Sequence, residues 1–391
     1  MIRSSNGFAG FVTRAAASVL LAILLTSKVA AQDAAEAEAP APPDARAIIA
    51  DARKILTPQG VEESYAVEIG GIKQWISVRG RDRRNPILLF IHGGPASTDM
   101  PVSWLYQSPW EDFFTVVQWD QRGAGKSWAA NDDPASIAKT ISIEQMTQDG
   151  VDLVGYLREK YGKEKIFVLG HSWGTVIGLN IALRHPDWLH AYIGMGQVVN
   201  GQENEKLGYE FALREAKRAK NELAIKELEA IAPYPDPSRP LSFDQVLIQR
   251  KWVIHFGGLT AGRSDFSYDT NARLLSPEYD DADLAAGRHV AASLVALIPG
   301  LIEIDYRKVT RLDTPLFIMA GRRDFETPSA LAARWFSTIR APSKRLFWFE
   351  HSAHMLQFEQ PGKLLMHLVN DVRPIAAEAG DVAPADAAGT D

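Results

Sequence analysis

Short runs of consecutive apolar residues recur along the chain. Ile87–Ile91 is apolar at every position, as expected for a strand that is buried on both faces of a sheet. Phe114–Trp119 and Lys165–Leu169 show a similar pattern, and Leu316–Ala320 and Leu346–Phe349 resume it much later in the chain. These runs predict strands on both sides of a long intervening region.

Amphipathic stretches lie between the early runs. Ile143–Tyr161 has apolar residues at helical spacing, and Thr175–Leu183 begins a second helical pattern directly after Gly174. Ala66–Val78 is predicted to be a further strand. Because strand, turn, helix and strand follow one another in this order, the pattern predicts an α/β fold with a mainly parallel central sheet and flanking helices.

The region 200–307 is different. Asn204–Ala232 has the pattern of a long, charged amphipathic helix, Phe243–His255 and Leu284–Ile298 have further helical patterns, and no buried strand is evident among them. Prolines end the first helix, because proline lacks a backbone N–H and clashes with the preceding turn; they are Pro233, Pro235, Pro237 and Pro240. We therefore predict a helical cap inserted into the α/β core.

The N-terminal residues have the layout of a secretory signal. Arg3 and Arg14 precede the apolar run Ala15–Leu25, and small residues lead to a cleavage site near Ala31. The run is short for a membrane span, although an uncleaved anchor is the alternative. Residues 1–31 are therefore predicted to be a signal peptide, which implies a periplasmic or secreted protein with no stable membrane partner after cleavage.

Two further segments have little to bury. Residues 32–44 are rich in Ala, Pro and acidic residues and are predicted to be a flexible linker, and the Ala-rich tail 375–391 is predicted to be disordered. The folded body then consists of a core in two parts, 45–199 and 308–374, with the cap between them.

Composition excludes several classes of protein. The 391 residues are 46% hydrophobic and 23% charged, which is ordinary for a globular protein. The net charge of −6 gives no basic field for nucleic acid. The chain has no cysteine, so disulfides, thiolate metal sites and a cysteine nucleophile are all excluded. A nucleophile must therefore be an oxygen or a nitrogen.

The motif GHSWG at 170–174 directly follows a predicted buried strand and directly precedes a helix. This is the context of a nucleophile elbow, in which glycines permit a very tight turn and the serine hydroxyl is lifted clear of the sheet. The start of the following helix also directs backbone N–H groups at the site. Ser172 is therefore the candidate nucleophile.

A nucleophilic serine needs a base and an acid that orients it, and after this elbow they follow in the order Asp or Glu, then His. Asp324 and His354 each follow one of the two late strands, so both are expected at the carboxyl edge of the sheet, near Ser172. Glu326 is the alternative acid and His351 the alternative base.

The motif HGGP at 92–95 follows the apolar strand Ile87–Ile91. The backbone N–H groups of Gly94 and Trp173 are candidates for an oxyanion hole, which would stabilise negative charge on a substrate carbonyl oxygen. The alternative is a tight turn that only ends the strand.

The segment DQRGAGKS at 120–127 is similar to the end of a phosphate-binding P-loop. That motif requires a glycine at position 120, where this chain has Asp120. We therefore predict a structural turn and no nucleotide binding.

Taken together, the motifs resemble those of the α/β-hydrolase superfamily, and within it the proline iminopeptidase-like serine peptidases of the S33 type. The matching segments are HGGP at 92–95, WDQRGAGKS at 119–127, GHSWG at 170–174, GRRD at 321–324, and His354 with EQP at 359–361. The resemblance implies a triad of Ser172, Asp324 and His354, an oxyanion hole at Gly94 and Trp173, and a helical cap over the pocket. It implies no metal and no organic cofactor.

Two departures from the family pattern bear on function. Ala96 stands where the family loop usually has a glycine. Iminopeptidases hold the free amino terminus of a substrate with acidic residues of the cap. The candidates in this chain are Glu203, Glu205 and Glu210, and the alternative is that these residues form a solvated, charged helix face.

The predicted function is a serine hydrolase for a small-molecule or short-peptide substrate. The favoured form is an aminopeptidase of the proline iminopeptidase type, which releases N-terminal Pro or small residues. A carboxylesterase or lipase-type enzyme for small apolar esters is the main alternative, and a non-catalytic binding protein is a minor one.

Overall fold

The computed structural model describes residues 44–286 and 290–384. The predicted signal peptide 1–31, nearly all of the predicted linker and residues 385–391 of the tail lie outside the described residues. Within the described ranges, no helix has both the length and the apolar character needed to cross a membrane.

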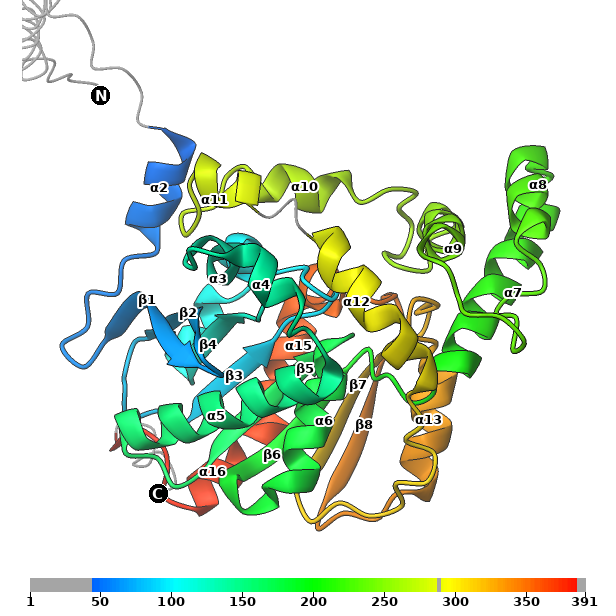
Figure 1. Cartoon of the computed structure of the whole chain (residues 1–391). Helices are drawn as coiled ribbons and strands as arrows, with labels where there is room; N and C mark the ends of the chain where they lie inside the picture. The colour runs from blue at the N-terminus through cyan, green and yellow to red at the C-terminus, as the bar shows by residue number, and fades with distance from the viewer. Residues whose placement is uncertain (1–43, 287–289, 385–391) are drawn as a thin grey trace, which may run out of the picture. The chain divides into compact units, whose positions relative to one another are not determined.

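A central sheet organises the described chain, in which eight strands lie in the order β1-β2-β4-β3-β5-β6-β7-β8 (Figure 1). β1 and β2 are antiparallel, β2 is antiparallel to β4, and the strands from β4 to β8 run parallel. This confirms the predicted mainly parallel sheet. The strands are β1 (Val61–Ile69), β2 (Ile72–Gly80), β3 (Ile87–Ile91), β4 (Thr115–Asp120), β5 (Ile166–His171), β6 (Leu189–Met195), β7 (Leu316–Gly321) and β8 (Lys344–Phe349).

Two strands differ from the sequence prediction. The predicted strand Ala66–Val78 is the hairpin of β1 and β2, which turns at Gly70 and Gly71 with φ angles of 58° and 76°. Glycine adopts such positive φ angles without steric cost, so the turn interrupts an otherwise continuous β pattern. β6 was not predicted, although all of its residues are buried.

Helices cover both faces of the sheet. Strand β3 has apolar side chains on both faces, so both faces must be covered. Ile87, Leu89 and Ile91 belong to one apolar cluster, and Leu88 and Phe90 belong to the other. The first cluster includes residues of α5 (Ile143–Tyr161), α6 (Gly174–Arg184) and α13 (Ser329–Thr338). The second includes residues of α14 (Leu356–Glu359), α15 (Pro361–His367) and α16 (Pro374–Glu378).

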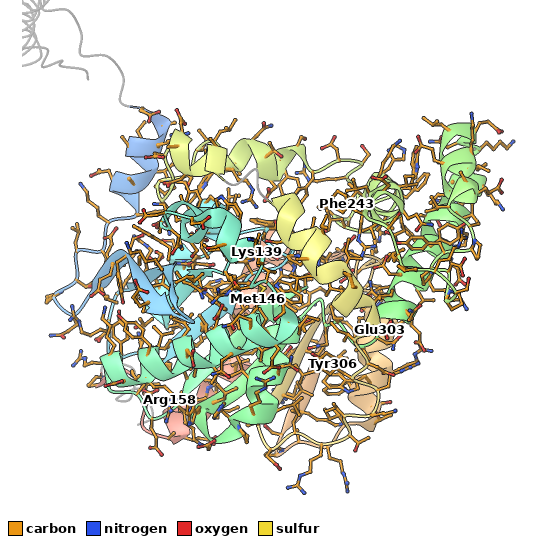
Figure 2. The ribbon with its side chains drawn as sticks, viewed as in Figure 1. Lys139, Met146, Arg158, Phe243, Glu303 and Tyr306 are labelled. Carbon is orange, nitrogen blue, oxygen red and sulfur yellow. The ribbon has the colours of Figure 1, made fainter. Side chains whose placement is uncertain are left out.

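Helix α5 shows the division between core and surface along one element. Met146, near its start, is buried in the first cluster, whereas Arg158, in its last turn, donates to the carbonyl oxygen of Glu164 at 2.7 Å (Figure 2). Ser142 caps the helix by accepting from the backbone N–H of Gln145. The helix therefore has the apolar face that its sequence pattern predicts, and a serine cap at its start.

The cap lies between β6 and β7 and is helical. Its elements are α7 (Gly201–Ala219), α8 (Glu222–Ala230), α9 (Phe243–His255), α10 (Ser267–Arg273), α11 (Asp281–Ala286) and α12 (Val290–Glu303). The single helix predicted for Asn204–Ala232 breaks at Lys220, which has a φ of 52°. The pattern at Leu284–Ile298 is divided between α11 and α12, and α10 was not predicted. The remaining α-helices of the described residues are α2 (Ala45–Ala52), α3 (Gly125–Ala129) and α4 (Pro134–Ala138).

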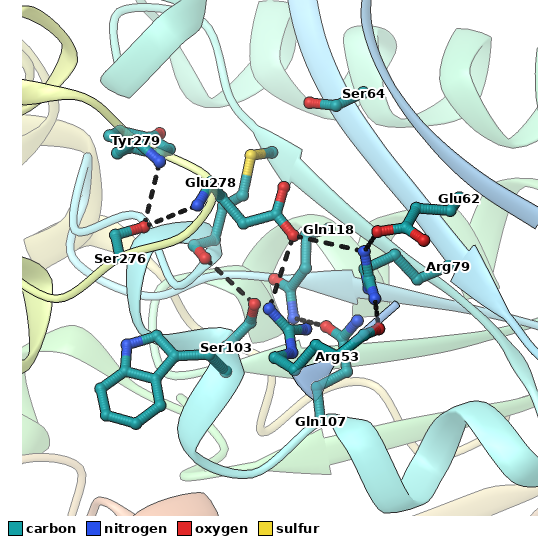
Figure 3. A network of polar contacts seen from close by, with 12 residues as sticks. Arg53, Glu62, Ser64, Arg79, Ser103, Gln107, Gln118, Ser276, Glu278 and Tyr279 are labelled. Carbon is teal, nitrogen blue, oxygen red and sulfur yellow. Dashed lines mark hydrogen bonds and ion pairs between the residues drawn. The ribbon is translucent and has the colours of Figure 1, made fainter. Parts of the chain in front are cut away.

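A buried ionic network joins the cap to the core (Figure 3). Arg53, just after α2, lies 3.6 Å from the carboxylate of Glu278 in the cap, and Arg79 on β2 lies 2.6 Å from Glu62. Glu111 has no exposed side-chain surface and lies 3.3 Å from Arg53 and 3.0 Å from Arg79. The cluster thus pairs Arg53 and Arg79 of the core with Glu278 of the cap as well as with Glu62 and Glu111 of the core.

The prediction of a disordered tail over 375–391 is wrong for its first part. Ala376 on α16 is fully buried, and Asp381 forms an ion pair with Lys163 and a hydrogen bond with His190 Nε2 at 2.9 Å. An Ala-rich segment therefore packs here because small side chains fit closely against the core and one carboxylate has two polar partners. Residues 385–391 lie outside the described residues.

Candidate active site

Ser172 occupies a tight turn between β5 and α6, and its φ of 54° is unusual for a residue with a side chain. Glycines on both sides make the turn feasible. A Cβ atom at Gly170 would lie 2.4 Å from the carbonyl oxygen of Gly174, and one at Gly174 would lie 2.0 Å from that of Ile91. The GHSWG motif thus forms a strained strand-to-helix turn with Ser172 at its apex.

His354 and Asp324 are in contact. His354 Nδ1 lies 2.9 Å from Asp324 Oδ2, and both residues are almost completely buried. The backbone N–H groups of Glu326 and Thr327 donate to Asp324 Oδ1 at 3.0 and 2.9 Å, and the Thr327 hydroxyl donates to Oδ2 at 3.0 Å. These donors hold the carboxylate in one orientation toward the imidazole.

The loop that carries His354 lies against the turn that carries Ser172. The rings of His171 and His354 are 4.8 Å apart, and His171 Nε2 lies 3.1 Å from the carbonyl oxygen of His354. The backbone N–H of Ser172 donates to the carbonyl oxygen of Met195 at 2.9 Å. Gly196 follows Met195, and a Cβ atom on it would lie 2.7 Å from His354 Cε1. The fold therefore brings the three predicted triad residues to one edge of the sheet.

The alternative acid and base do not form the corresponding contact. His351 is exposed, and the carboxylate of Glu326 pairs with Arg250 in the cap. Among the two candidate acids and two candidate bases, the pair in contact is therefore Asp324 and His354.

The electrostatics favour a proton-accepting role for His354. Burial lowers the pKa of this imidazole, but Asp324, with further help from Glu326 and Glu359, outweighs burial and raises it above its ordinary value. Burial lowers the pKa of His171 well below its ordinary value. His171 therefore stays neutral beside a histidine that can accept a proton.

The HGGP loop lies directly beside Ser172. A Cβ atom at Gly93 would lie 3.0 Å from Ser172 Cβ, and Gly94 has a φ of 112°. Among the hydrogen bonds of the described chain, none is donated by the backbone N–H of Gly94 or Trp173. Both residues line the same cavity as Ser172, so these two groups are available to a ligand.

His92 supports this loop. Its Nδ1 lies 2.8 Å from the carbonyl oxygen of Gly93, and its Nε2 accepts from the backbone N–H of Gln121 at 3.3 Å. Burial lowers the pKa of His92 to about 4, so the ring is neutral. The Gln121 side chain also accepts from the indole of Trp173 at 2.8 Å, which ties the loop to the elbow.

A cavity of about 490 Å³ opens at Ser172. Gly94 and Trp173 line it from the core, and the cap supplies mostly apolar side chains from α9 and α12. Glu205, Arg250 and Glu326 are its charged residues. A mainly apolar pocket with a few polar groups is typical of a small-molecule site.

Of the three glutamates proposed to hold an amino terminus, only Glu205 lines this cavity. The prediction is wrong for the other two. Glu203 faces the other way and pairs with Arg307 at 2.7 Å, and Glu210, whose side chain is 48% exposed, lies 3.8 Å from Lys206. On a helix of 3.6 residues per turn, positions 203 and 205 point in different directions.

Arg250 joins two carboxylates in the cavity. Its guanidinium lies 2.5 Å from Glu205 Oε1 and 2.5 Å from Glu326 Oε1. Glu205 Oε2 also accepts from the Tyr234 hydroxyl at 2.5 Å, whereas the buried Glu326 Oε2 has no hydrogen-bond partner. Burial raises the pKa of Glu326, although Arg250 opposes this effect. The cluster carries one more carboxylate than it has cations.

Sequence reasoning missed the role of Arg250 and considered Glu326 only as an alternative acid. One signal was present, because Arg250 interrupts an apolar stripe on α9. A single charged residue on an otherwise apolar helix face indicates a buried partner. Among the described residues, no group of three or more His, Cys, Asp or Glu side chains could bind a metal.

The fold and this site together define an α/β hydrolase of the serine type. The model of the family described as "Serine aminopeptidase, S33" matches residues 87–361. The chain therefore belongs to the S33 serine aminopeptidase family, as the resemblance predicted, and is a serine hydrolase.

Three individual proteins are similar to this chain. The chain is 30% identical over 298 residues to the probable aminopeptidase YbaC of Bacillus subtilis (strain 168), covering 75% of this chain and 91% of the relative. The proline iminopeptidase structure from Mycobacterium smegmatis has a TM-score of 0.59 at 19% identity, over 81% of this chain and 100% of that one. A proline iminopeptidase-related protein of Thermus thermophilus has a TM-score of 0.56 at 21% identity, over 81% and 98%. At these identities the two structures show the fold alone.

Proposed function

We propose that the protein is an aminopeptidase that cleaves the first peptide bond of substrates with a free amino terminus. The observation that carries this proposal is the excess carboxylate beside Ser172, where Glu205 and Glu326 share the single cation Arg250. A buried ammonium group must be paired with a negative group, and this cluster offers one. The name of the Bacillus subtilis relative supports the same activity.

The chemical step that we propose is acyl transfer to Ser172. The serine hydroxyl oxygen attacks the carbonyl carbon of the first residue while His354 accepts the hydroxyl proton, and Asp324 stabilises the imidazolium that forms. The N–H groups of Gly94 and Trp173 donate to the oxyanion. His354 then gives its proton to the leaving amine, and a water molecule releases the acyl group by the same steps.

Glu326 is the proposed anchor for the substrate's ammonium group. Its Oε2 atom is buried and without a partner, and the residue lies two positions after Asp324 on the same loop. Because one loop carries both side chains, the distance from the ammonium site to the catalytic acid is set by a short, hydrogen-bonded segment. This arrangement would place the first peptide bond, and no later one, at Ser172.

The test compares aminoacyl arylamides that have a free amine with their N-acetylated forms and with short nitrophenyl esters. We expect turnover of the free arylamides and at least about tenfold slower turnover of the blocked ones, because a charged hydrogen bond is worth about 1.5–3 kcal/mol. Turnover of esters alone would refute the aminopeptidase and support the carboxylesterase alternative.

A variant pair sharpens this test. Glu326→Gln should raise KM for free arylamides by about 10- to 100-fold, because the amide lacks the negative charge. Its effect on ester turnover should be much smaller, because an ester without an amine does not use the anchor. Glu210→Gln is the matched control, because Glu210 is exposed on the cap outside the cavity. Equal effects of the two variants would contradict the assignment of Glu326.

A further inference from the structure

We propose that the apolar part of the cavity binds a large apolar side chain on the N-terminal residue of the substrate. This inference rests on the proposed function and changes its expected specificity, from proline or small residues to residues such as leucine and phenylalanine. Three observations support it, namely the apolar faces of two cap helices, the volume between them, and the position of the charged cluster.

Helix α9 contributes an apolar stripe to the cavity. Phe243, Val246, Leu247 and Ile254 all line it, at the spacing of one helix face. Arg250 lies on the same face and is held by Glu205 and Glu326. Leu247 remains 48% exposed, so this face is not closed by the protein's own side chains.

Helix α12 contributes the opposing wall. Leu294, Ile298, Leu301 and Ile302 line the cavity at spacings of four, three and one residues, which also describe one helix face. Two apolar helix faces that line one space without filling it are unfavourable in water, because apolar surface is stabilised only when it is removed from water. A bound apolar group would remove this surface from water.

The volume of the cavity is suited to a substrate side chain larger than the methyl group of alanine or the ring of proline. The cavity of about 490 Å³ lies within the range of about 300–1,000 Å³ that is usual for pockets holding drug-sized ligands. An alanyl or prolyl group held at Ser172 would leave most of the wall formed by α9 and α12 exposed to water. A leucyl or phenylalanyl side chain would cover more of it.

The charged cluster of Glu205, Arg250 and Glu326 would fix the orientation of the bound substrate. Glu326 and Thr327 line the cavity on the loop of the catalytic acid, and Ser172 lines it from the elbow. An ammonium group at Glu326 and a carbonyl group at Ser172 leave the side chain of the same residue as the substituent that can enter the apolar region. The apolar walls therefore select the first residue of the substrate.

The first test is a comparison of wild-type kcat/KM for Leu-, Phe-, Ala- and Pro-arylamides. We expect the Leu or Phe substrate to exceed Ala and Pro by at least about tenfold, because small differences in apolar side chains are worth about 10- to 200-fold in such pockets. A preference for Pro or Ala would overturn this inference and leave the aminopeptidase intact. Turnover of none of the four would overturn both.

The second test fills the cavity from α12. Leu294→Trp should lower kcat/KM for the Phe substrate by at least about tenfold and change that for Ala by less than about threefold. Val295→Trp is the matched control, because Val295 is the next residue of the helix, is 56% exposed and does not line the cavity. Val246→Trp fills the space from α9 and should repeat the effect of Leu294→Trp. Equal losses for the Phe and Ala substrates in both filling variants would overturn the inference.

Discussion

The backbone N–H of His354 donates to the carbonyl oxygen of Leu259 in the cap, at 2.9 Å. The neighbouring cap residue Gly258 accepts in the same way from Phe325, beside Asp324, at 3.0 Å. One cap loop, Gly257–Gly262, is thus hydrogen-bonded to the loops of both the proposed base and the proposed acid. The cap therefore helps to set the geometry of the two loops in addition to forming the wall of the cavity.

Aromatic packing strengthens this connection. The rings of Phe211 on α7 and Phe325 on the acid loop are stacked, with centroids 3.9 Å apart and an interplanar angle of 6°. Glu359, on α14, accepts from the backbone N–H groups of Ala353 at 3.0 Å and Ala261 at 2.5 Å. A single, partly buried carboxylate thereby joins the cap loop to the residue that precedes His354.

Replacement of the proposed nucleophile tests the chemical assignment. Ser172→Ala should lower kcat by about 10⁴-fold or more, because the base and acid cannot act without the nucleophile. The measurement is arylamide turnover, together with labelling by a fluorophosphonate probe and a circular dichroism spectrum to confirm folding. Retention of most activity by a folded variant would refute the triad.

The pH dependence follows from the raised pKa of His354. The base must be neutral to accept a proton, so kcat/KM should fall as the pH decreases through a pKa above the ordinary value of about 6.5. Asp324→Asn should shift this acid limb to lower pH, because the variant removes the strongest influence that raises the pKa. It should also lower kcat by about 10⁴-fold, as in other triads. An acid limb that does not move in Asp324→Asn would contradict the assignment of the acid.

Glu359 is predicted to be a positioning residue. Glu359→Ala removes the acceptor for two N–H groups and should lower kcat more than it raises KM, because the His354 loop is less well held. Glu359→Gln keeps an acceptor oxygen but removes a charge that raises the pKa of His354, so its acid limb should move to lower pH.

The control for both variants is Glu350→Gln. Glu350 is exposed and pairs with Arg322 at 2.7 Å, so its loss should leave the pH profile unchanged. An identical profile in wild type and Glu359→Gln would show that Glu359 has only a structural role.

The ion pairs of Glu111 with Arg53 and Arg79 lead to a stability prediction. Glu111→Ala leaves Arg53 and Arg79 without their fully buried partner and should lower the free energy of unfolding by about 3–5 kcal/mol. Asp112→Ala is the control, because Asp112 is the next residue, is 51% exposed and should contribute at most about 1 kcal/mol through its pair with Arg81. Urea unfolding measures the free energy of unfolding of both variants. Equal decreases in the two variants would show that burial of the network is unimportant for stability.

Much of the core was predictable because its signals are local. The apolar runs marked most of the parallel strands, and GHSWG between a strand and a helix marked Ser172, since the tight turn needs its glycines at fixed positions. The apolar pattern of strand β6 is less distinct than that of Ile87–Ile91, because it contains His190 and Gly194. The pattern of Ala66–Val78 predicts one strand where the structure has the hairpin of β1 and β2, because a two-glycine turn interrupts an otherwise continuous β pattern.

Local sequence patterns were therefore enough to predict the class of fold, the elbow and two candidates each for the acid and the base. The folded chain was needed to show that Asp324 contacts His354 and that Glu205, rather than Glu203 or Glu210, faces the cavity. It was also needed to show that Arg250 joins Glu205 to Glu326. The physical reason is that these contacts join residues from separate helices and loops. Their energies depend on burial and on the direction of each side chain, and neither is encoded in local spacing.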